Sequence, residues 1–203
     1  MSSTGQTRPF DIGSLGGAEP PVIPDRDRAD GRRPVAWNGS ADIGLLVLRF
    51  VIGGLFFAHG AQKVIGMWGG LGPAATAENL RGYGFVAQAD ALAWALGIAE
   101  MAAGAFVVLG LLTPLAAAGL VSIKIVAVAV KWGTVPLYAA AAPDALEIDL
   151  LLGGGALALL FTGAGRVALD RGRTWQRRPL PYSWLCLVIA VGIAAVVYYL
   201  LRG

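Results

Sequence analysis

The sequence predicts an all-α integral membrane protein, with a bundle of four transmembrane helices followed by a fifth, C-terminal one. Of its 203 residues, 56% are hydrophobic and 14% are charged, whereas roughly a quarter of the residues in a soluble domain are charged. Five apolar runs approach the ~20 residues that span the hydrocarbon of a bilayer. The arginines gather in two segments that flank apolar runs, which is typical of a membrane topology signal and not of a nucleic-acid-binding face.

The N-terminal segment, 1–42, is predicted to be a disordered cytoplasmic tail. It contains five prolines, and the mixed-charge run DRDRADGRR fills 25–33. Such a segment cannot bury enough apolar surface to offset the entropy lost on ordering. Two interpretations stay open, a solvated leader and a tail that folds onto a partner subunit. The segment lacks the apolar core and cleavage site of a signal peptide, so we expect the first helix to direct membrane insertion.

Each apolar run is predicted to form one transmembrane helix. The first four build the bundle, which occupies 43–170 with its loops, while 171–182 is a basic cytoplasmic loop and 183–203 holds the additional helix. Thr113-Pro114 marks a tight turn, because proline suits a first helical position and disfavours helix in the residue before it. The predicted helices are 43–65, 91–112, 114–130, 146–162 and 183–201.

The distribution of basic residues predicts a multi-pass plasma-membrane protein with a cytoplasmic N-terminus and a C-terminus outside. Lys and Arg are enriched in cytoplasmic loops. Ten arginines fall on one side of the five predicted helices: Arg8, Arg26, Arg28, Arg32, Arg33, Arg166, Arg171, Arg173, Arg177 and Arg178. Four basic residues fall on the other side: Lys63, Arg81, Lys131 and Arg202.

Ionisable residues within the predicted helices are the candidate site residues, because a charge in hydrocarbon costs at least a few kcal/mol and normally faces a partner. At ~1.5 Å of rise per residue, Arg49 lies about 9 Å from the inner boundary, Lys124 about 15 Å and Glu100 about 16 Å. We therefore expect these three to form a buried charge cluster. It is either an ion pair that fixes helix register or a proton or substrate relay.

A second cluster is predicted near the outer boundary. His59 and Asp149 both fall about 25 Å from the inner boundary, and Lys63 lies near the outer surface. Together with Glu147 they form a candidate contact to a quinone or a partner, beneath an outer loop at 66–90. For His59 the interpretations are a hydrogen-bonded interfacial histidine, a hydrogen bond to a quinone head, and a contact to a partner.

The composition predicts no cofactor bound by this chain itself. Cys186 is the only cysteine and His59 the only histidine. One cysteine excludes an intramolecular disulfide, a CxxC pair and a four-cysteine iron–sulfur site, and one histidine argues against a membrane haem. No nucleophile elbow is present. We therefore expect no metal and no catalytic residues, and at most a contact to quinone or lipid.

Three stretches share the order and spacing of their motifs with a known family. They are LRFVIGGLFFAHGAQKVIGMWGG from Leu48, AEMAAGAFVVLGLLTPLAA around Glu100, and TGAGRVALD from Thr162. Over about 42–170 the chain resembles the DoxX family. The resemblance implies a four-helix membrane bundle, usually a small subunit associated with respiratory or sulfur-oxidising quinone-linked enzymes. The long tail and the fifth span depart from that pattern.

On this basis we expect a non-catalytic accessory subunit that stabilises a respiratory electron-transport complex. The Arg-, Gly- and Ala-rich composition is compatible with an actinobacterial source, and the resemblance then implies association with a cytochrome bcc–aa3 supercomplex. The expected partners are respiratory oxidase or cytochrome subunits and membrane lipids, and not nucleic acid. Two alternatives stay open. One is a quinone-linked membrane oxidoreductase subunit with a site near His59, and the other is a small-molecule permease that uses Glu100 and Lys124.

Overall fold

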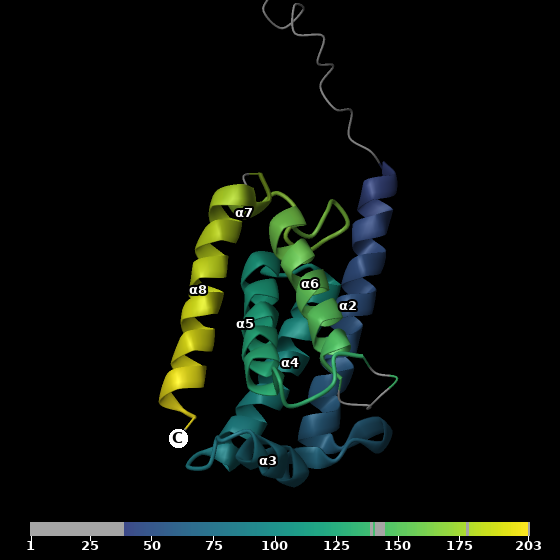
Figure 1. The fold of residues 1–203 in the computed structure, drawn as a ribbon. Helices are drawn as coiled ribbons and strands as arrows, with labels where there is room; N and C mark the ends of the chain where they lie inside the picture. Colours follow the sequence, from purple (N-terminus) through teal and green to yellow (C-terminus); the bar gives the residue numbers. More distant parts are fainter. Residues whose placement is uncertain (1–38, 139, 141–144, 178, 203) are drawn as a thin grey trace, which may run out of the picture. The chain divides into compact units, whose positions relative to one another are not determined.

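The computed structural model describes residues 39–138, 140, 145–177 and 179–202, and this part of the chain is all-helical, without a β-strand. The tail predicted at 1–42 lies almost wholly outside the described residues. The helices are α2 (Gly39–Ile65), η2 (Met67–Gly69), α3 (Gly72–Gly82), α4 (Ala89–Leu109), α5 (Thr113–Lys131), α6 (Leu146–Thr162), α7 (Thr174–Arg177) and α8 (Pro179–Leu200), as labelled in Figure 1.

All five predicted apolar runs form helices, and several of their ends differ from the prediction, including the start of α2, which begins four residues earlier than predicted. α6 has the predicted bounds. α4 ends three residues earlier than predicted, because Gly110 (φ 63°) and Leu112 (φ 47°) adopt left-handed conformations that a helix does not continue. α8 begins at Pro179, four residues earlier than predicted, since proline is tolerated in the first helical turn.

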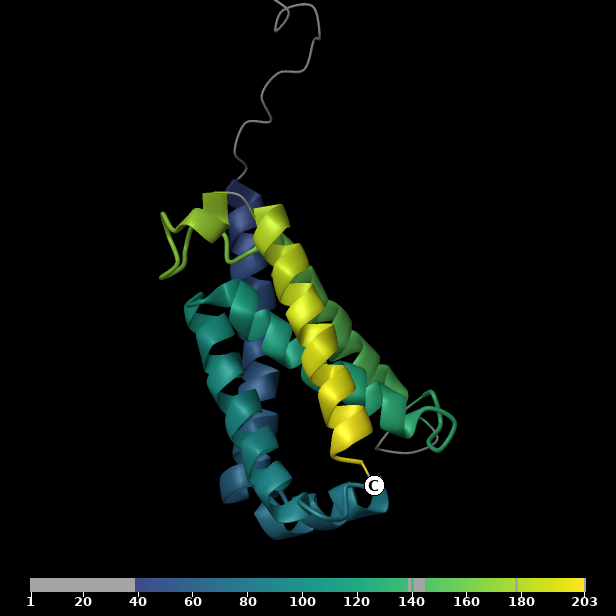
Figure 2. The ribbon, with the colours of Figure 1, turned by 90° about the vertical axis from the view of Figure 1, so that its left-hand side faces the viewer.

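Four helices, α2, α4, α5 and the 180–200 part of α8, are long and apolar enough to cross a membrane. α6 has 17 residues, about 25 Å of helix. It packs beside α5, and in Figure 2 it runs behind α8. At its start the Leu146 N–H donates to the Pro136 carbonyl, just after α5, and beyond its end the Leu169 N–H donates to the Leu109 carbonyl at the end of α4.

The described chain therefore crosses the bundle five times. The last crossing ends near the connection between α2 and α4, because Arg202 Nε donates to the Tyr83 carbonyl (3.0 Å), just after α3. α2 starts at the opposite end, where the Asp42 carboxylate accepts the backbone N–H of Arg166 (2.8 Å). We call these the Tyr83 end and the Asp42 end of the bundle.

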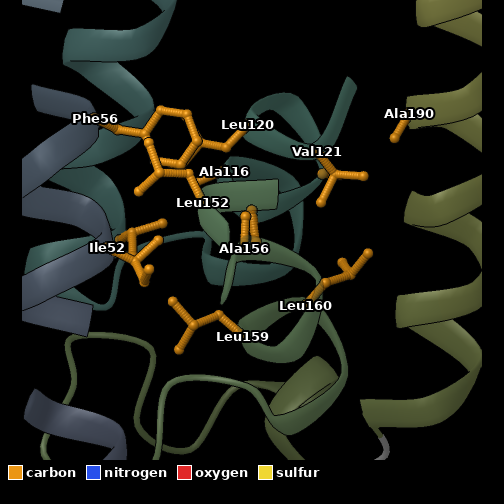
Figure 3. Close-up of a cluster of buried hydrophobic side chains, with 13 residues drawn as sticks. Ile52, Phe56, Ala116, Leu120, Val121, Leu152, Ala156, Leu159, Leu160 and Ala190 are labelled. Carbon is orange, nitrogen blue, oxygen red and sulfur yellow. The ribbon is translucent and has the colours of Figure 1, made fainter. Parts of the chain in front are cut away.

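An apolar core lies where α2, α5 and α6 meet (Figure 3). Phe56 from α2, Leu120 from α5, and Leu159 and Leu160 from α6 are fully buried. α5 contributes three consecutive alanines, 116–118, all buried. Small side chains on a helix let neighbouring backbones approach closely, which is the usual way that helices associate in a membrane.

α2 and α4 are in direct backbone contact through two pairs of glycines. A Cβ atom on Gly60 would lie 2.5 Å from the Gly97 carbonyl oxygen, and one on Gly53 would lie 2.7 Å from the Gly104 carbonyl oxygen. Gly53 and Gly60 are seven residues apart on α2, and Gly97 and Gly104 are seven residues apart on α4. The two glycines of each helix therefore lie on one face. These contacts fix the register of the two antiparallel helices, and with it the position of the charges they carry.

Candidate functional site

A group of ionisable side chains from four helices lies on the Tyr83 side of the core. Its first pair joins Lys63 of α2 to Glu100 of α4, with Lys63 Nζ donating to Glu100 Oε2. The Glu100 side chain is 2% exposed and that of Lys63 is 26% exposed. The cation is thus at the edge of the group, and its carboxylate partner lies inside the bundle.

The second ion pair is a carboxylate shared by two lysines. Asp149 of α6 accepts from Lys124 Nζ (2.7 Å) and from Lys131 Nζ (3.0 Å), both on α5. All three side chains are less than 15% exposed. Lys124 Nζ also lies 5.2 Å from the centre of the Phe56 ring, in a cation–π arrangement. A buried charge in a membrane-spanning bundle needs such partners, because unpaired it costs several kcal/mol.

This pairing differs from the grouping that the sequence predicts. Glu100 and Lys124, placed together at the sequence level, each have a different ion partner, and Arg49 joins neither pair. The reason is the glycine register of α2 and α4. Gly60 faces Gly97, and because the helices are antiparallel, Lys63 lies about one turn to one side of this contact and Glu100 about one turn to the other. A helical side chain leans toward the N-terminus of its own helix. Lys63 therefore leans toward Glu100.

His59 lies between the two ion pairs and is half-buried. The charges of Lys63, Lys124, Glu100 and Asp149 all act on its imidazole. Within the part of the chain that the structure describes, no hydrogen bond of the His59 ring is found. The predicted outer set of His59, Lys63 and Asp149 is thus brought together, with Glu100 and Lys124 added to it.

Glu147, the remaining residue of the predicted outer set, is half-buried near the start of α6. Its backbone N–H donates to the Leu137 carbonyl (2.9 Å). Among the described residues its carboxylate forms no ion pair, so the structure does not place it with Asp149. Lys131, absent from the predicted set, takes the place beside Asp149. Its spacing of seven residues from Lys124 puts both on one face of α5, and that spacing is the sequence signal for it.

Arg49, 2% exposed, binds backbone carbonyls at the Asp42 end of the bundle. Its Nε and Nη2 donate to the Val107 and Val108 carbonyls (3.0 and 2.6 Å), in the last turn of α4. Its Nη1 donates to the Ala164 and Val167 carbonyls (2.7 and 2.6 Å), in the loop after α6. The last carbonyls of a helix have no partner within it and carry partial negative charge, so a cation is favourable there.

Asp170 completes this arrangement by capping α5. Its carboxylate accepts the backbone N–H groups of Leu112 (2.9 Å) and Thr113 (2.8 Å). These bonds hold Leu112 in its left-handed conformation, which costs a non-glycine residue of order 1–3 kcal/mol. We call Arg49, Asp170, Asp42 and the backbone groups they bind the Arg49 clamp. Asp170 is not among the site residues predicted from the sequence. The available signal is that α5 starts after Leu112, which has no side-chain oxygen to cap the helix, so the cap has to come from elsewhere in the chain.

An apolar groove of about 640 Å³ lies between α5, α6 and α8. Lys124 and Asp149 line it, and Trp132 and Trp184 line it as well. α8 contacts α6 near its own N-terminal end, where Ser183 Oγ donates to the Leu160 carbonyl (2.6 Å) and the Trp184 ring meets Phe161 edge-on. The Lys124–Asp149 ion pair therefore lines the groove.

The apolar helices, their five crossings and the paired charges inside the bundle define an α-helical, multi-pass membrane protein. Residues 44–132 match the model of the DoxX family. The match covers α2 to the end of α5, with His59, Lys63, Glu100 and both lysines of α5. No curated protein and no solved structure matched the chain. Among the described residues no group of His, Cys, Asp and Glu is arranged to hold a metal ion.

Proposed function

We propose that this protein is a non-catalytic accessory subunit of a respiratory electron-transport complex, similar in role to the association factor of actinobacterial cytochrome bcc–aa3 supercomplexes. In this proposal it lies in the plasma membrane with its N-terminus cytoplasmic and its C-terminus outside. The DoxX match supports the membrane-subunit class. The observation that carries the proposal is an unused helix face on α2.

The outward face of α2 carries a small residue between two exposed aromatic side chains. Phe50 and Phe57 are 57% and 39% exposed, and Gly54 lies between them along the helix. A Cβ on Gly54 would meet nothing within 4 Å, so this chain does not use its small size for internal packing. A small residue between bulky ones lets a second transmembrane helix approach closely. We infer that a helix of a partner subunit packs here.

Co-purification tests this proposal. The tagged full chain is extracted in mild detergent, and the proteins that accompany it are identified. We expect respiratory oxidase or cytochrome subunits. Gly54→Leu overfills the inferred contact, which costs ~1–3 kcal/mol, roughly 5- to 150-fold in affinity, and the partner should be lost in proportion.

Gly192→Leu on α8 is the matched control, because a Cβ there also meets nothing within 4 Å. It should retain the partner at wild-type yield. If the chain purifies alone, and if its deletion leaves the assembly of the oxidase unchanged, the accessory role is wrong. Loss of the partner in both glycine variants would remove α2 as the docking face.

A second candidate, a quinone-linked oxidoreductase subunit, is favoured by one specific observation. The ring of His59 has no hydrogen-bond partner in the described part of the chain, and it lies among four charges. An imidazole can donate a hydrogen bond to a quinone carbonyl, and the groove beyond Lys124 and Asp149 is apolar enough for an isoprenoid tail. His59→Ala should then abolish quinone-linked turnover while the complex still assembles. Unchanged turnover in an assembled complex would exclude this candidate.

A further inference from the structure

The loop after α6 presents basic and apolar side chains together at the Asp42 end of the bundle. Arg171 and Arg173 are exposed. Two aliphatic side chains in the same loop, Val167 and Leu169, are 58% and 63% exposed. We call these four residues the Arg171 surface. It is independent of the α2 face and of the ion pairs around His59.

The backbone beneath the Arg171 surface is held in place by the bundle. The Val167 carbonyl accepts from Arg49 Nη1 (2.6 Å). The Leu169 and Asp170 N–H groups donate to the Leu109 and Gly110 carbonyls (3.3 and 2.8 Å). The side chains that point outward are therefore carried on a fixed scaffold, and less ordering entropy is lost when a ligand binds them.

The positive charge of this surface is not neutralised by the part of the chain that the structure describes. No described carboxylate pairs with Arg171 or Arg173. The Arg173 guanidinium lies 5.8 Å from the centre of the Trp175 ring, which leaves its N–H groups available in the plane of the fork. Arg81, by contrast, pairs with Glu78 (3.1 Å) and Asp90 (2.7 Å), and these hydrogen bonds raise the pKa of Arg81 above its ordinary value.

We propose that the Arg171 surface binds the phosphate of an anionic phospholipid headgroup. The two arginines supply planar donors that match phosphate oxygens, and Val167 and Leu169 lie against the adjoining hydrocarbon. Basic residues next to a membrane-spanning helix attract anionic lipids at close range. The joint exposure of aliphatic and basic side chains favours a lipid surface over an acidic protein, since a lipid offers both the charge and the hydrocarbon. The site works in whichever leaflet this end of the bundle occupies.

The experiment measures lipid binding to the full chain in detergent by native mass spectrometry. The probes are phosphatidylglycerol and phosphatidylcholine with identical acyl chains. Each arginine at an anionic surface contributes about a fivefold factor in affinity. The double substitution Arg171→Gln and Arg173→Gln should therefore weaken phosphatidylglycerol binding about 25-fold and leave phosphatidylcholine binding unchanged. Arg81→Gln, which removes an already paired arginine at the other end, should change neither.

The conservative double variant, Arg171→Lys with Arg173→Lys, should keep most of the preference for phosphatidylglycerol, because the charge remains. Its retention also shows that the substituted loop still folds. Equal binding of the two lipids to the wild-type chain would overturn the proposal, and so would an unchanged preference in the glutamine variant. Binding of an acidic peptide that depends on the same two arginines, without any preference among lipids, would assign the surface to a protein partner instead.

Discussion

Replacing Arg49 by methionine tests whether the Arg49 clamp stabilises the fold. The substitution keeps most of the side-chain volume and removes a guanidinium that donates to four carbonyls. It also removes the electrostatic attraction between Arg49 and the Asp170 carboxylate. The backbone hydrogen bonds from Leu169 and Asp170 to the Leu109 and Gly110 carbonyls still join the end of α4 to the loop after α6, so we expect the connection to be weakened and not lost.

The size of the effect follows from the number and kind of these bonds. A hydrogen bond to a charged group contributes ~1.5–3 kcal/mol, but the bonds of one side chain are not additive. The deletion also relieves the cost of burying a charge. Leaving a buried acceptor without its donor costs about 1–3 kcal/mol, and for four carbonyls that do not add independently we expect Arg49→Met to cost about 3–5 kcal/mol. That is a large share of the ~5–15 kcal/mol that stabilises a typical domain.

The measurement is reversible unfolding in mixed micelles with a rising fraction of denaturing detergent, followed by helix content. Arg49→Lys should give an intermediate loss, because an ammonium keeps the charge but not the planar fork that reaches two segments. Arg171→Met, an exposed arginine in the same loop, is the control and should stay within ~0.5 kcal/mol of wild type. A loss below ~1 kcal/mol for Arg49→Met, or one equal to that of the control, would refute the reasoning.

Four further substitutions probe the packing and the charges of the bundle by the same unfolding measurement. Gly60→Leu should destabilise by ~1–3 kcal/mol or more, because its Cβ would lie 2.5 Å from the α4 backbone, whereas Gly54→Ala, with open space around it, should be neutral or stabilising by ~0.5–1 kcal/mol. Equal losses at the two glycines would contradict the close α2–α4 contact. Asp149→Asn should cost ~3–5 kcal/mol, because it leaves two cations without their shared carboxylate. Lys131→Met should cost less, because the Lys124–Asp149 pair remains.

The sequence predicts the helices of this protein well, because each one is an apolar run of the right length. The errors of the prediction fall at the ends of the helices. Thr113-Pro114 correctly marks a turn, yet Gly110 and Leu112 adopt left-handed conformations that a hydropathy pattern does not encode. The apolar run predicts a last helix from 183, whereas α8 begins at Pro179, where proline suits the first helical turn.

The sequence predicts the site less well, because depth along a helix does not determine which helix face meets which. Glu100 and Lys124 lie at similar predicted depths, but the Gly60–Gly97 contact turns Glu100 toward Lys63. The depth estimate places Arg49 in a charge cluster with Glu100 and Lys124. The ligands of Arg49 are main-chain carbonyls, which every residue possesses and which therefore leave no signal in the sequence.

The DoxX match ends at residue 132, but two buried cations within it, Arg49 and Lys124, have acceptors in residues that come later. Two of the four carbonyls bound by Arg49 belong to Ala164 and Val167. The carboxylate that pairs with Lys124 is Asp149 of α6. A fragment that stopped after α5 would therefore leave an arginine with half of its acceptors and a buried lysine without its counter-charge, each at a cost of several kcal/mol. Arg49 and Lys124 in the matched range thus depend on acceptors in α6 and the loop after it, so we expect these later segments to fold together with the matched range.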